Sequence, residues 1–288
     1  MNLHADCLAC IARGALDSAR LATDDEKLHF KIMQEVFKIL GDCALDVPPP
    51  VMALVIQQAV AGATGCTDPY KAIKRKYNDF CLDLYPELAG KTENSDFETA
   101  VRLCIAGNII DFGIHGSVGK QKVLDTIEDS LSMQITGCVK TLEKACENSK
   151  NILWIADNAG EIVFDRLVLE KLDRDIVTYA VRGGPTQNDA TMEDAQYTGI
   201  ADLVHVIDTG AAIPGIVIEL CSEEFRACYE KADLIISKGQ GNFETLDMND
   251  DRIFFIFKAK CPVVAECAGC RLNDMVIKNT GLKDNCYE

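Results

Sequence analysis

The chain has 288 residues, of which 48% are hydrophobic, and it carries a formal net charge of −16. Its length allows a sizeable core and two domains, and its charge argues against nucleic acid or an anionic membrane as the main partner. A small phosphorylated ligand remains compatible with that charge, because a bound cation can reverse the local field. No apolar run reaches membrane length and no targeting segment opens the sequence, which predicts a cytoplasmic protein. The sequence carries no mark of an oligomeric state.

The first part of the chain, residues 1–148, has the pattern of a mainly helical domain. Capping-box sequences, an aspartate–proline pair and apolar residues at helical spacing indicate where its helices begin. We expect one helix after the capping box at 23–26, a second at 51–61 and a third after Asp68 and Pro69. A further helix follows the capping box at 95–98, and residues 117–148 are expected to be helical as well.

One of these helices ends in the sequence AGNIID, at residues 106–111. Gly107 would allow a close backbone approach, and Asn108 and Asp111 would share one face if the helix continued. Such a pair could contact a ligand. From the local sequence alone, a buried Asn and Asp that satisfy loop amides are the more ordinary interpretation.

The second part, residues 149–288, alternates short apolar runs with helical stretches. This order predicts a mostly parallel sheet with helices on its faces. The expected strands are 152–156, 176–181, 203–207, 234–237, 253–257 and 263–265. Neither a dinucleotide fingerprint nor a P-loop sequence is present, so polar residues at the strand ends must indicate the ligand.

The first of these strands ends at Asp157 and Asn158, which a turn at Gly160 and a helix opened by Glu161 follow. In open α/β sheets, ligands bind at the carboxyl ends of strands and beside helix N-termini. Carboxylate and carboxamide oxygens there suit Mg²⁺ or Mn²⁺, and the helix N-terminus could accept a phosphate oxygen. The alternative is that Asp157 and Asn158 only cap the helix.

Two later strand ends carry similar polar turns. Asp189 follows a glycine-rich turn and could complete a ligand set with Asp157 and Asn158. Lys238 precedes Gly239, where an ammonium group and free backbone N–H groups could together hold a phosphate. Each residue also has a structural interpretation, with Asp189 as a helix cap and Lys238 as a solvated charge.

The fourteen cysteines include two CxxC pairs, Cys7 with Cys10 and Cys267 with Cys270. The two pairs could form one four-thiolate zinc or iron–sulfur site if the fold brought them together. They could equally form disulfides or remain free. Several of the other cysteines, Cys81, Cys104, Cys138 and Cys146, lie in helical patterns and are most simply small apolar core residues.

Several short sequences together resemble one protein family. They are CLAC at 7–10, AGNIID at 106–111, DNAGEIVFD at 157–165, NDAT at 188–191 and KGQGNFE at 238–244. The family is the metal-dependent damage-control phosphatases, also known as domain of unknown function 89 and as acidic-residue methyltransferase-like proteins. The likeness covers nearly the whole chain, and the amino-terminal CxxC is similar to that of the short archaeal and bacterial branch.

The resemblance implies a fold and a set of ligands. The fold would be α/β, with the helical domain 1–148 packed on a Rossmann-like domain 149–288 that binds metal and phosphate. Asp157, Asn158 and Asp189 would hold Co²⁺, Ni²⁺, Mn²⁺ or Mg²⁺, and Asp194 is an alternative third ligand. Substrate phosphate would be held or lined by Lys238, the turn amides of Gly160 and Gly239, Asn108, Asp111 and Glu244.

The activity implied is hydrolysis of phosphate monoesters of small metabolites, such as sugar phosphates or phosphopantetheine-like compounds. We expect direct metal-assisted attack of water, with Asp111 or Glu161 orienting or deprotonating it. An aspartyl-phosphate intermediate on Asp157 is the rival, which Ala159 disfavours because aspartate-nucleophile phosphatases commonly have a second aspartate there. Two alternative functions are an S-adenosylmethionine-dependent carboxyl methyltransferase and a non-catalytic metal or iron–sulfur protein built on the CxxC pairs.

Overall fold

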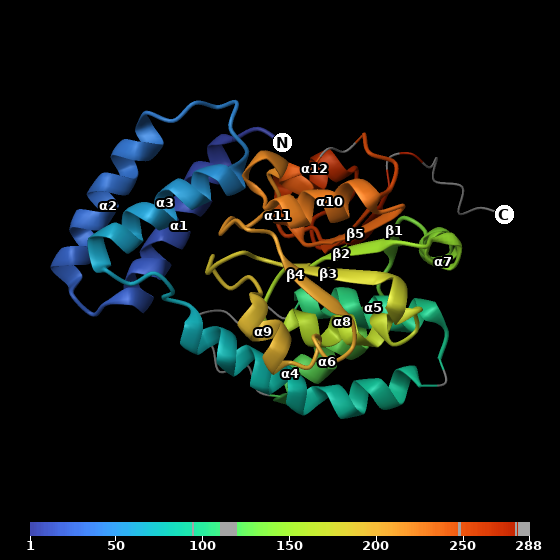
Figure 1. The fold of residues 1–288 in the computed structure, drawn as a ribbon. Coiled ribbons are helices and arrows are strands. Elements are labelled where there is room, and N and C mark those ends of the chain that lie inside the picture. Colours follow the sequence, from blue (N-terminus) through green and yellow to red (C-terminus); the bar gives the residue numbers. More distant parts are fainter. Residues whose placement is uncertain (94, 110–119, 247–248, 280, 282–288) are drawn as a thin grey trace.

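The fold was analysed in a computed structural model, which describes residues 1–93, 95–109, 120–246, 249–279 and 281 (Figure 1). These residues form twelve α-helices and a single seven-stranded sheet. The helices are α1 Ala5–Ala22, α2 Glu26–Gly41, α3 Pro49–Thr64, α4 Lys71–Thr92, α5 Phe97–Ile109, α6 Lys120–Ser132, α7 Val139–Asn148, α8 Glu161–Leu169, α9 Met192–Tyr197, α10 Glu223–Lys231, α11 Gln240–Thr245 and α12 Pro262–Ala268. The strands are β1 Ile135–Thr136, β2 Ile152–Ile155, β3 Val177–Val181, β4 His205–Asp208, β5 Leu234–Lys238, β6 Ile253–Lys258 and β7 Met275–Lys278.

The sheet has the strand order β1-β7-β6-β5-β2-β3-β4, and every neighbouring pair is parallel except β6 with β7. The chain builds outward from β2 through β3 to β4, and then crosses back to place β5 on the other side of β2. The connections therefore diverge between β2 and β5. A crevice at the carboxyl ends of strands forms at such a point, which is where ligands bind in open α/β sheets.

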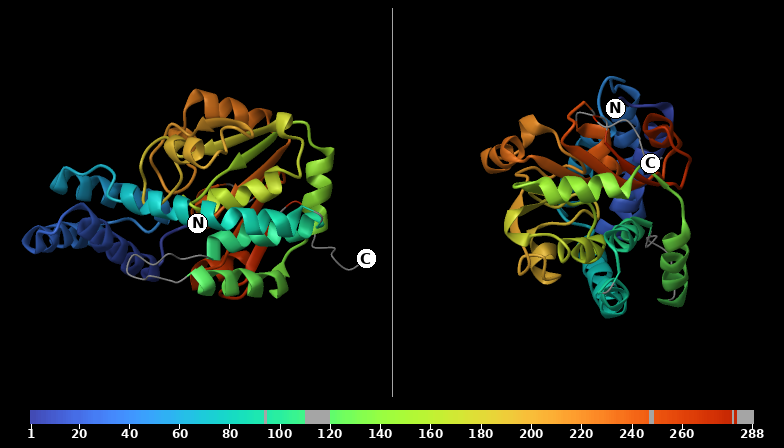
Figure 2. Two further views of the ribbon diagram at one scale, coloured as in Figure 1. Left: turned by 90° about the horizontal axis from the view of Figure 1, so that it is seen from below. Right: turned by 90° about the vertical axis from the view of Figure 1, so that its right-hand side faces the viewer.

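Alternate residues of the central strands face opposite layers of helices. In β2, Trp154 belongs to the core on one side of the sheet, whereas Leu153 and Ile155 belong to the core on the other side. Helices α4, α5, α6 and α8 lie on the first side, and α10, α11 and α12 lie on the second (Figures 1 and 2). This two-sided burial explains why β2 is apolar throughout.

Helices α1, α2 and α3 form a bundle with a core of its own, to which Ala19, Val36 and Ile56 contribute. The bundle stands beside the rest of the molecule (Figures 1 and 2). The boundary that we expected after residue 148 is not marked by a break in the core. One continuous cluster includes Leu103 of α5 and Trp154 of β2, because α5 packs directly on α8.

The expected α/β class with amino-terminal helices is confirmed, and several local expectations were wrong, among them the following four. Residues 263–265 are helical, because Pro262 occupies the first turn of α12, where its missing N–H costs nothing. The region 117–148 contains strand β1 between two helices. Helix α2 is capped by Asp25 rather than by the first residue of the 23–26 box, and α3 begins at Pro49 rather than after the prolines. No helix in the described ranges is both long and apolar enough to span a bilayer.

Candidate active site

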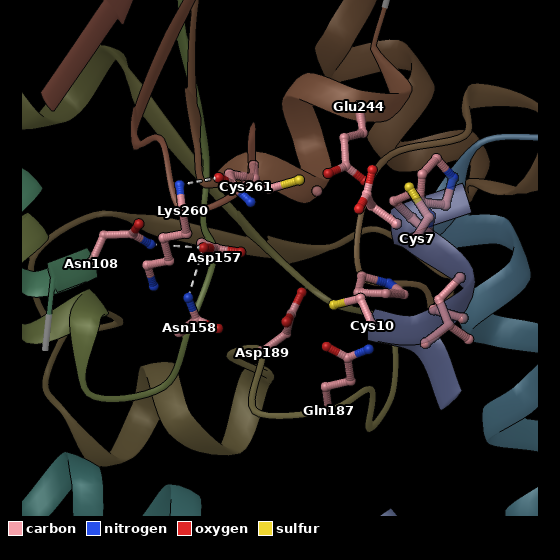
Figure 3. Close-up of a pocket in the computed structure, with 18 residues that line it drawn as sticks. Cys7, Cys10, Asn108, Asp157, Asn158, Gln187, Asp189, Glu244, Lys260 and Cys261 are labelled. Atoms are coloured by element: carbon pink, nitrogen blue, oxygen red, sulfur yellow. Dashed lines mark hydrogen bonds between the residues drawn. The ribbon is translucent and has the colours of Figure 1, made fainter. Parts of the chain in front are cut away.

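A pocket of about 310 Å³ lies between the α1–α3 bundle and the carboxyl ends of the central strands (Figure 3). Five of the predicted site residues line it, namely Asn108, Asp157, Asn158, Asp189 and Glu244. They come from α5, from the turn after β2, from the loop after β3 and from α11. The fold therefore brings together side chains that are far apart in the sequence.

The backbone holds the three predicted metal ligands side by side. The Ala190 N–H donates to the Asp157 carbonyl at 2.8 Å, and the Ala159 N–H donates to the Asn188 carbonyl at 2.8 Å. These two bonds make an isolated antiparallel bridge between Asn158 and Asp189. The relative positions of the two acidic turns are therefore fixed by main-chain contacts and do not depend on a ligand.

Two carboxamides orient the carboxylate of Asp157. The Nδ2 atoms of Asn108 and Asn158 donate to its Oδ2 at 3.0 and 2.6 Å. The same two Nδ2 atoms also donate to Oε2 of Glu161, at 2.7 and 3.1 Å. Because Glu161 is only 2% exposed, it lies behind the two amides and fixes their orientation.

Arg182, the first residue after β3, lies between the two aspartates. Its Nε donates to Oδ2 of Asp189 at 2.6 Å, and its Nη2 lies 4.0 Å from Oδ1 of Asp157. In the described part of the chain, this buried Nη2 has no hydrogen-bond partner. Arg182 is thus a site residue that we did not predict from the sequence.

The two buried aspartates are electrostatically unfavourable as they stand. Burial raises the pKa of Asp157 well above its usual range, and the charges of Glu161 and Asp189 raise it further. Burial also raises the pKa of Asp189, which Arg182 partly offsets. A divalent cation between these carboxylates would remove the repulsion, so the site fits such an ion.

The donor set also fits a hard cation. Asp157 and Asp189 supply carboxylate oxygens, and Asn158 donates through nitrogen, which leaves its amide oxygen for a ligand role. Among the residues described, no three His, Cys, Asp or Glu side chains form a metal site. A two-carboxylate set that water and substrate phosphate complete is the usual arrangement for Mg²⁺.

Lys238 does not line this pocket, contrary to its expected role as a phosphate holder. Its side chain is fully buried, and its Nζ lies 2.8 Å from Oε1 of Glu161 and 2.5 Å from Oδ1 of Asp165. This contact lowers the pKa of Glu161 although burial alone would raise it. Lys238 is therefore placed to keep Glu161 ionised behind the site.

The two turn glycines do not offer free amides to a phosphate either. The Gly160 N–H donates to Oδ1 of Asn78 at 2.7 Å, and the Gly239 N–H donates to the Ile256 carbonyl at 3.0 Å. Gly239 has φ +81°, and a Cβ added there would lie 2.1 Å from Cγ of Asp157. Its importance lies in the space it leaves for the Asp157 carboxylate.

Lys260 is the cation that the sequence analysis missed. It follows β6, is exposed, and lines the pocket with Asp157 (Figure 3). Its charge acts to lower the pKa of Asp157. Lys260 follows a predicted strand, as Lys238 does at its strand end, and this position was the available signal, although no glycine turn follows Lys260.

Asp194, the alternative third ligand, does not line the pocket. Asp194 caps α9 and accepts from Nζ of Lys74 at 3.1 Å and from Nδ2 of Asn78 at 2.8 Å. It is therefore committed to the fold and cannot replace Asp189. Asp111 lies outside the described residues, and its role stays a prediction.

Comparison with known proteins identifies the family. The sequence model of the damage-control phosphatase ARMT1-like domain matches residues 3–276. The chain belongs to this family. A damage-control phosphatase of Pyrococcus horikoshii is 37% identical, over 92% of this chain and 93% of that protein. A damage-control phosphatase of Archaeoglobus fulgidus is 32% identical, over 96% and 99% of the two chains.

The solved structure of a P. horikoshii protein of the same family, described there as DUF89, superposes with a TM-score of 0.88. The two are 33% identical, and the match covers 97% of this chain and 99% of the other. An uncharacterised protein of Methanocaldococcus jannaschii is 38% identical over 96% of this chain and 95% of its own length. The resemblance and the fold class expected from the sequence are thus both confirmed.

The cysteines of this damage-control phosphatase family member are not arranged as a joint site of the two CxxC pairs. Cys7 and Cys10 line the pocket together with Cys261, the residue before α12, whereas Cys267 and Cys270 do not (Figure 3). Burial raises the pKa of the Cys7 and Cys10 thiols, which favours their protonated forms. Among the described residues, no thiolate metal site is formed.

Glu244 provides a prediction for stability against pH. Burial raises the pKa of its carboxyl from 4.5 to about 7, and the charge of the chain's amino terminus opposes the shift. The folded state therefore binds more protons than the unfolded state between these values, so Glu244 lowers stability progressively as pH rises from 4.5 to 7. As pH rises across this window, the unfolding free energy of Glu244→Gln should increase relative to that of wild type by up to about 3 kcal/mol. Urea unfolding at several pH values measures this difference.

The matched control for this experiment is the same substitution at exposed Glu223 on α10, which reports the effect of removing a surface charge. The expectation would be contradicted if the difference in unfolding free energy between wild type and Glu244→Gln stayed constant from pH 4.5 to 8.

Proposed function

We propose that this chain is a divalent-metal-dependent phosphatase that hydrolyses phosphate monoesters of small metabolites, sugar phosphates and phosphopantetheine-like compounds included. The observation that carries the proposal is the convergence of Asp157, Asn158 and Asp189 at one end of a pocket that also contains Lys260. Oxygen ligands and a single ammonium group are what a metal ion and a phosphate require. Membership of the family supports the same activity.

Each polar residue at this end has a role in the proposed reaction. A divalent ion held by Asp157, Asn158 and Asp189 would neutralise phosphoryl oxygens and make a water molecule more acidic. Lys260 would bind a phosphoryl oxygen and stabilise the charge that develops there. Arg182 would hold Asp189 in place, as it does in the structure.

Glu161 is better suited to positioning than to proton abstraction. One carboxylate oxygen accepts from Asn108 and Asn158, and the other contacts Lys238. With both oxygens engaged in this way and only 2% of the residue exposed, Glu161 has no access to substrate. We propose that it orients the amide of Asn158, so that deprotonation of water falls to another group.

The test is hydrolysis of p-nitrophenyl phosphate by metal-stripped protein, to which Mg²⁺, Mn²⁺, Co²⁺ or Ni²⁺ is returned singly. We expect turnover with at least one ion. Asp157→Asn should lower kcat by about 100-fold or more because a charged ligand is lost. Lys260→Met should lower kcat/KM by about 10- to 100-fold, the value of one charge-assisted hydrogen bond.

The matched control is Asp208→Asn, since Asp208 ends β4 at the same edge of the sheet but does not line the pocket. It should retain wild-type turnover. Hydrolysis that is independent of metal, or that survives Asp157→Asn undiminished, would refute the proposal. Stabilisation by S-adenosylmethionine without any hydrolysis would instead support methyl transfer.

A further inference from the structure

The loop between β3 and α9 contains a residue in a costly backbone conformation. Gln187 has φ +44°, in the left-handed region that glycine and asparagine tolerate and other residues rarely adopt. Such a conformation costs about 1–3 kcal/mol and persists only where the surroundings impose it. Glycine would avoid this cost, as it does at Gly160 and Gly239 beside the same pocket, which have φ +79° and +81°.

Contacts on both sides of Gln187 impose this conformation. Gln57 of α3 donates from Nε2 to the Pro185 carbonyl at 2.6 Å and accepts from Oγ1 of Thr186 at 2.9 Å. On the other side, the Asn188 carbonyl accepts from the Ala159 N–H at 2.8 Å. The bundle and the metal-binding turn thus hold the loop at both ends, and residue 187 has little freedom to relax.

The side chain of Gln187 does nothing visible for the fold. It is exposed, it lines the pocket, and its amide end points into the pocket beside Asp189 (Figure 3). Within the part of the chain that the structure describes, its amide makes no hydrogen bond. A strained position that carries a long polar side chain aimed into a pocket is suited to ligand binding.

The chemistry of the pocket indicates what this amide would bind. Beyond the acidic end, one wall is apolar, formed by Ile11, Pro49, Pro50 and Ala53 of the bundle. Phosphate is already provided for by Lys260 and the proposed metal. A neutral carboxamide that can both donate and accept is a natural partner for a hydroxyl group in the alcohol part of the ester.

We propose that Gln187 is a specificity-determining residue that hydrogen-bonds a hydroxyl group of the substrate alcohol. It thereby selects phosphate monoesters of hydroxylated metabolites over esters of simple apolar alcohols. This inference rests on the proposed phosphatase function. The backbone strain is retained because the loop must present this amide while Gln57 and the metal-binding turn hold its ends.

Two esters separate recognition of the alcohol from the chemistry. Glycerol 2-phosphate has free hydroxyl groups, and phenyl phosphate has none. Gln187→Ala removes the amide and keeps the strain, whereas Gln187→Gly removes both. For glycerol 2-phosphate, both variants should lower kcat/KM by about 2- to 12-fold, the value of one neutral hydrogen bond. For phenyl phosphate, both should stay within about twofold of wild type.

Thermal unfolding gives an independent measurement. Gln187→Gly should raise Tm by about 1–4 °C because strain is relieved, and Gln187→Ala should not. Asn273→Gly is the matched control, since Asn273 has φ +73° but does not line the pocket. Asn273→Gly should raise Tm no more than Gln187→Gly does, and it should leave kcat/KM unchanged for both glycerol 2-phosphate and phenyl phosphate.

Equal losses for both esters would overturn the inference and assign Gln187 to holding Asp189 in place. Unchanged kinetics for both esters would overturn it as well. If wild type hydrolyses neither ester, the proposed function fails separately. Stabilisation by glycerol 2-phosphate with Mn²⁺ then provides the test, with a loss in Gln187→Ala supporting recognition and equal stabilisation refuting it.

Discussion

Substitution of Gly239 by alanine is expected to abolish metal-dependent turnover. The added Cβ would lie 2.1 Å from both Cγ and Oδ2 of Asp157, so the carboxylate must move away from its amide partners. If Asp157 holds the proposed metal ion, loss of its correct placement should cost about 100-fold or more in kcat. The φ of +81° adds backbone strain. Activity should be measured with saturating Mn²⁺, and folding should be followed by circular dichroism.

Gly269→Ala controls for the backbone strain in this experiment. Gly269 ends α12 with φ +71°, and a Cβ there would meet nothing within 4 Å. It should lose about 1 kcal/mol of stability and keep full activity. If both variants lost activity to the same degree, the close approach of Gly239 to Asp157 would not explain the loss in Gly239→Ala.

Replacement of Lys238 by methionine is expected to damage stability more than any other single charge removal near the site. It leaves Glu161 and Asp165 buried without their shared cation. Breaking a buried ion pair by removing one partner costs about 3–5 kcal/mol. The loss should be visible in urea unfolding, and adding Asp165→Asn to Lys238→Met should recover part of it.

Lys260→Met is the natural comparison, because Lys260 is exposed and lines the pocket. It should change kinetic constants with little effect on stability, whereas Lys238→Met should change stability first. If Lys238 instead held the substrate phosphate, as we predicted from the sequence, Lys238→Met would change the kinetic constants and have little effect on stability. A stable Lys238→Met protein with a raised KM would restore Lys238 as the residue that contacts phosphate.

The position of the site could be predicted because strand ends are visible in the sequence. Asp157, Asn158 and Asp189 follow apolar runs that form adjacent strands, and the carboxyl ends of parallel strands lie along one edge. The sheet itself was predictable for the same reason. The run at 263–265 was misassigned because a short apolar stretch does not distinguish a strand from a helix.

The burial of Lys238 away from the pocket has a physical cause that the sequence already contained. Residues two apart in a strand face the same side, so Lys238 points with Ile236 toward the layer that contains α8. Within α8, Glu161 and Asp165 are four residues apart on an otherwise buried helix. Two carboxylates in such a place require a cation, and a lysine on the facing strand position supplies it.

The far wall of the pocket could not be predicted from local patterns. Ile11, Cys10 and Pro49 reach the site only because the α1–α3 bundle docks against strand ends more than 100 residues away in sequence. That docking depends on contacts such as Gln57 with Pro185, which no local periodicity indicates. The same holds for Gln187, whose φ is set by contacts on both sides of its loop.

The separate core of the α1–α3 bundle has a consequence for how this protein can evolve. The groups proposed to perform the reaction lie in the segments that follow the strands, whereas Ile11, Pro49 and Ala53 stand on helices that have a core of their own. Mutations of these three residues can therefore reshape the alcohol side of the pocket, while the contacts of Gln57 with the loop before Asp189 stay in place. Substrate range could drift by this route while the reaction itself is preserved.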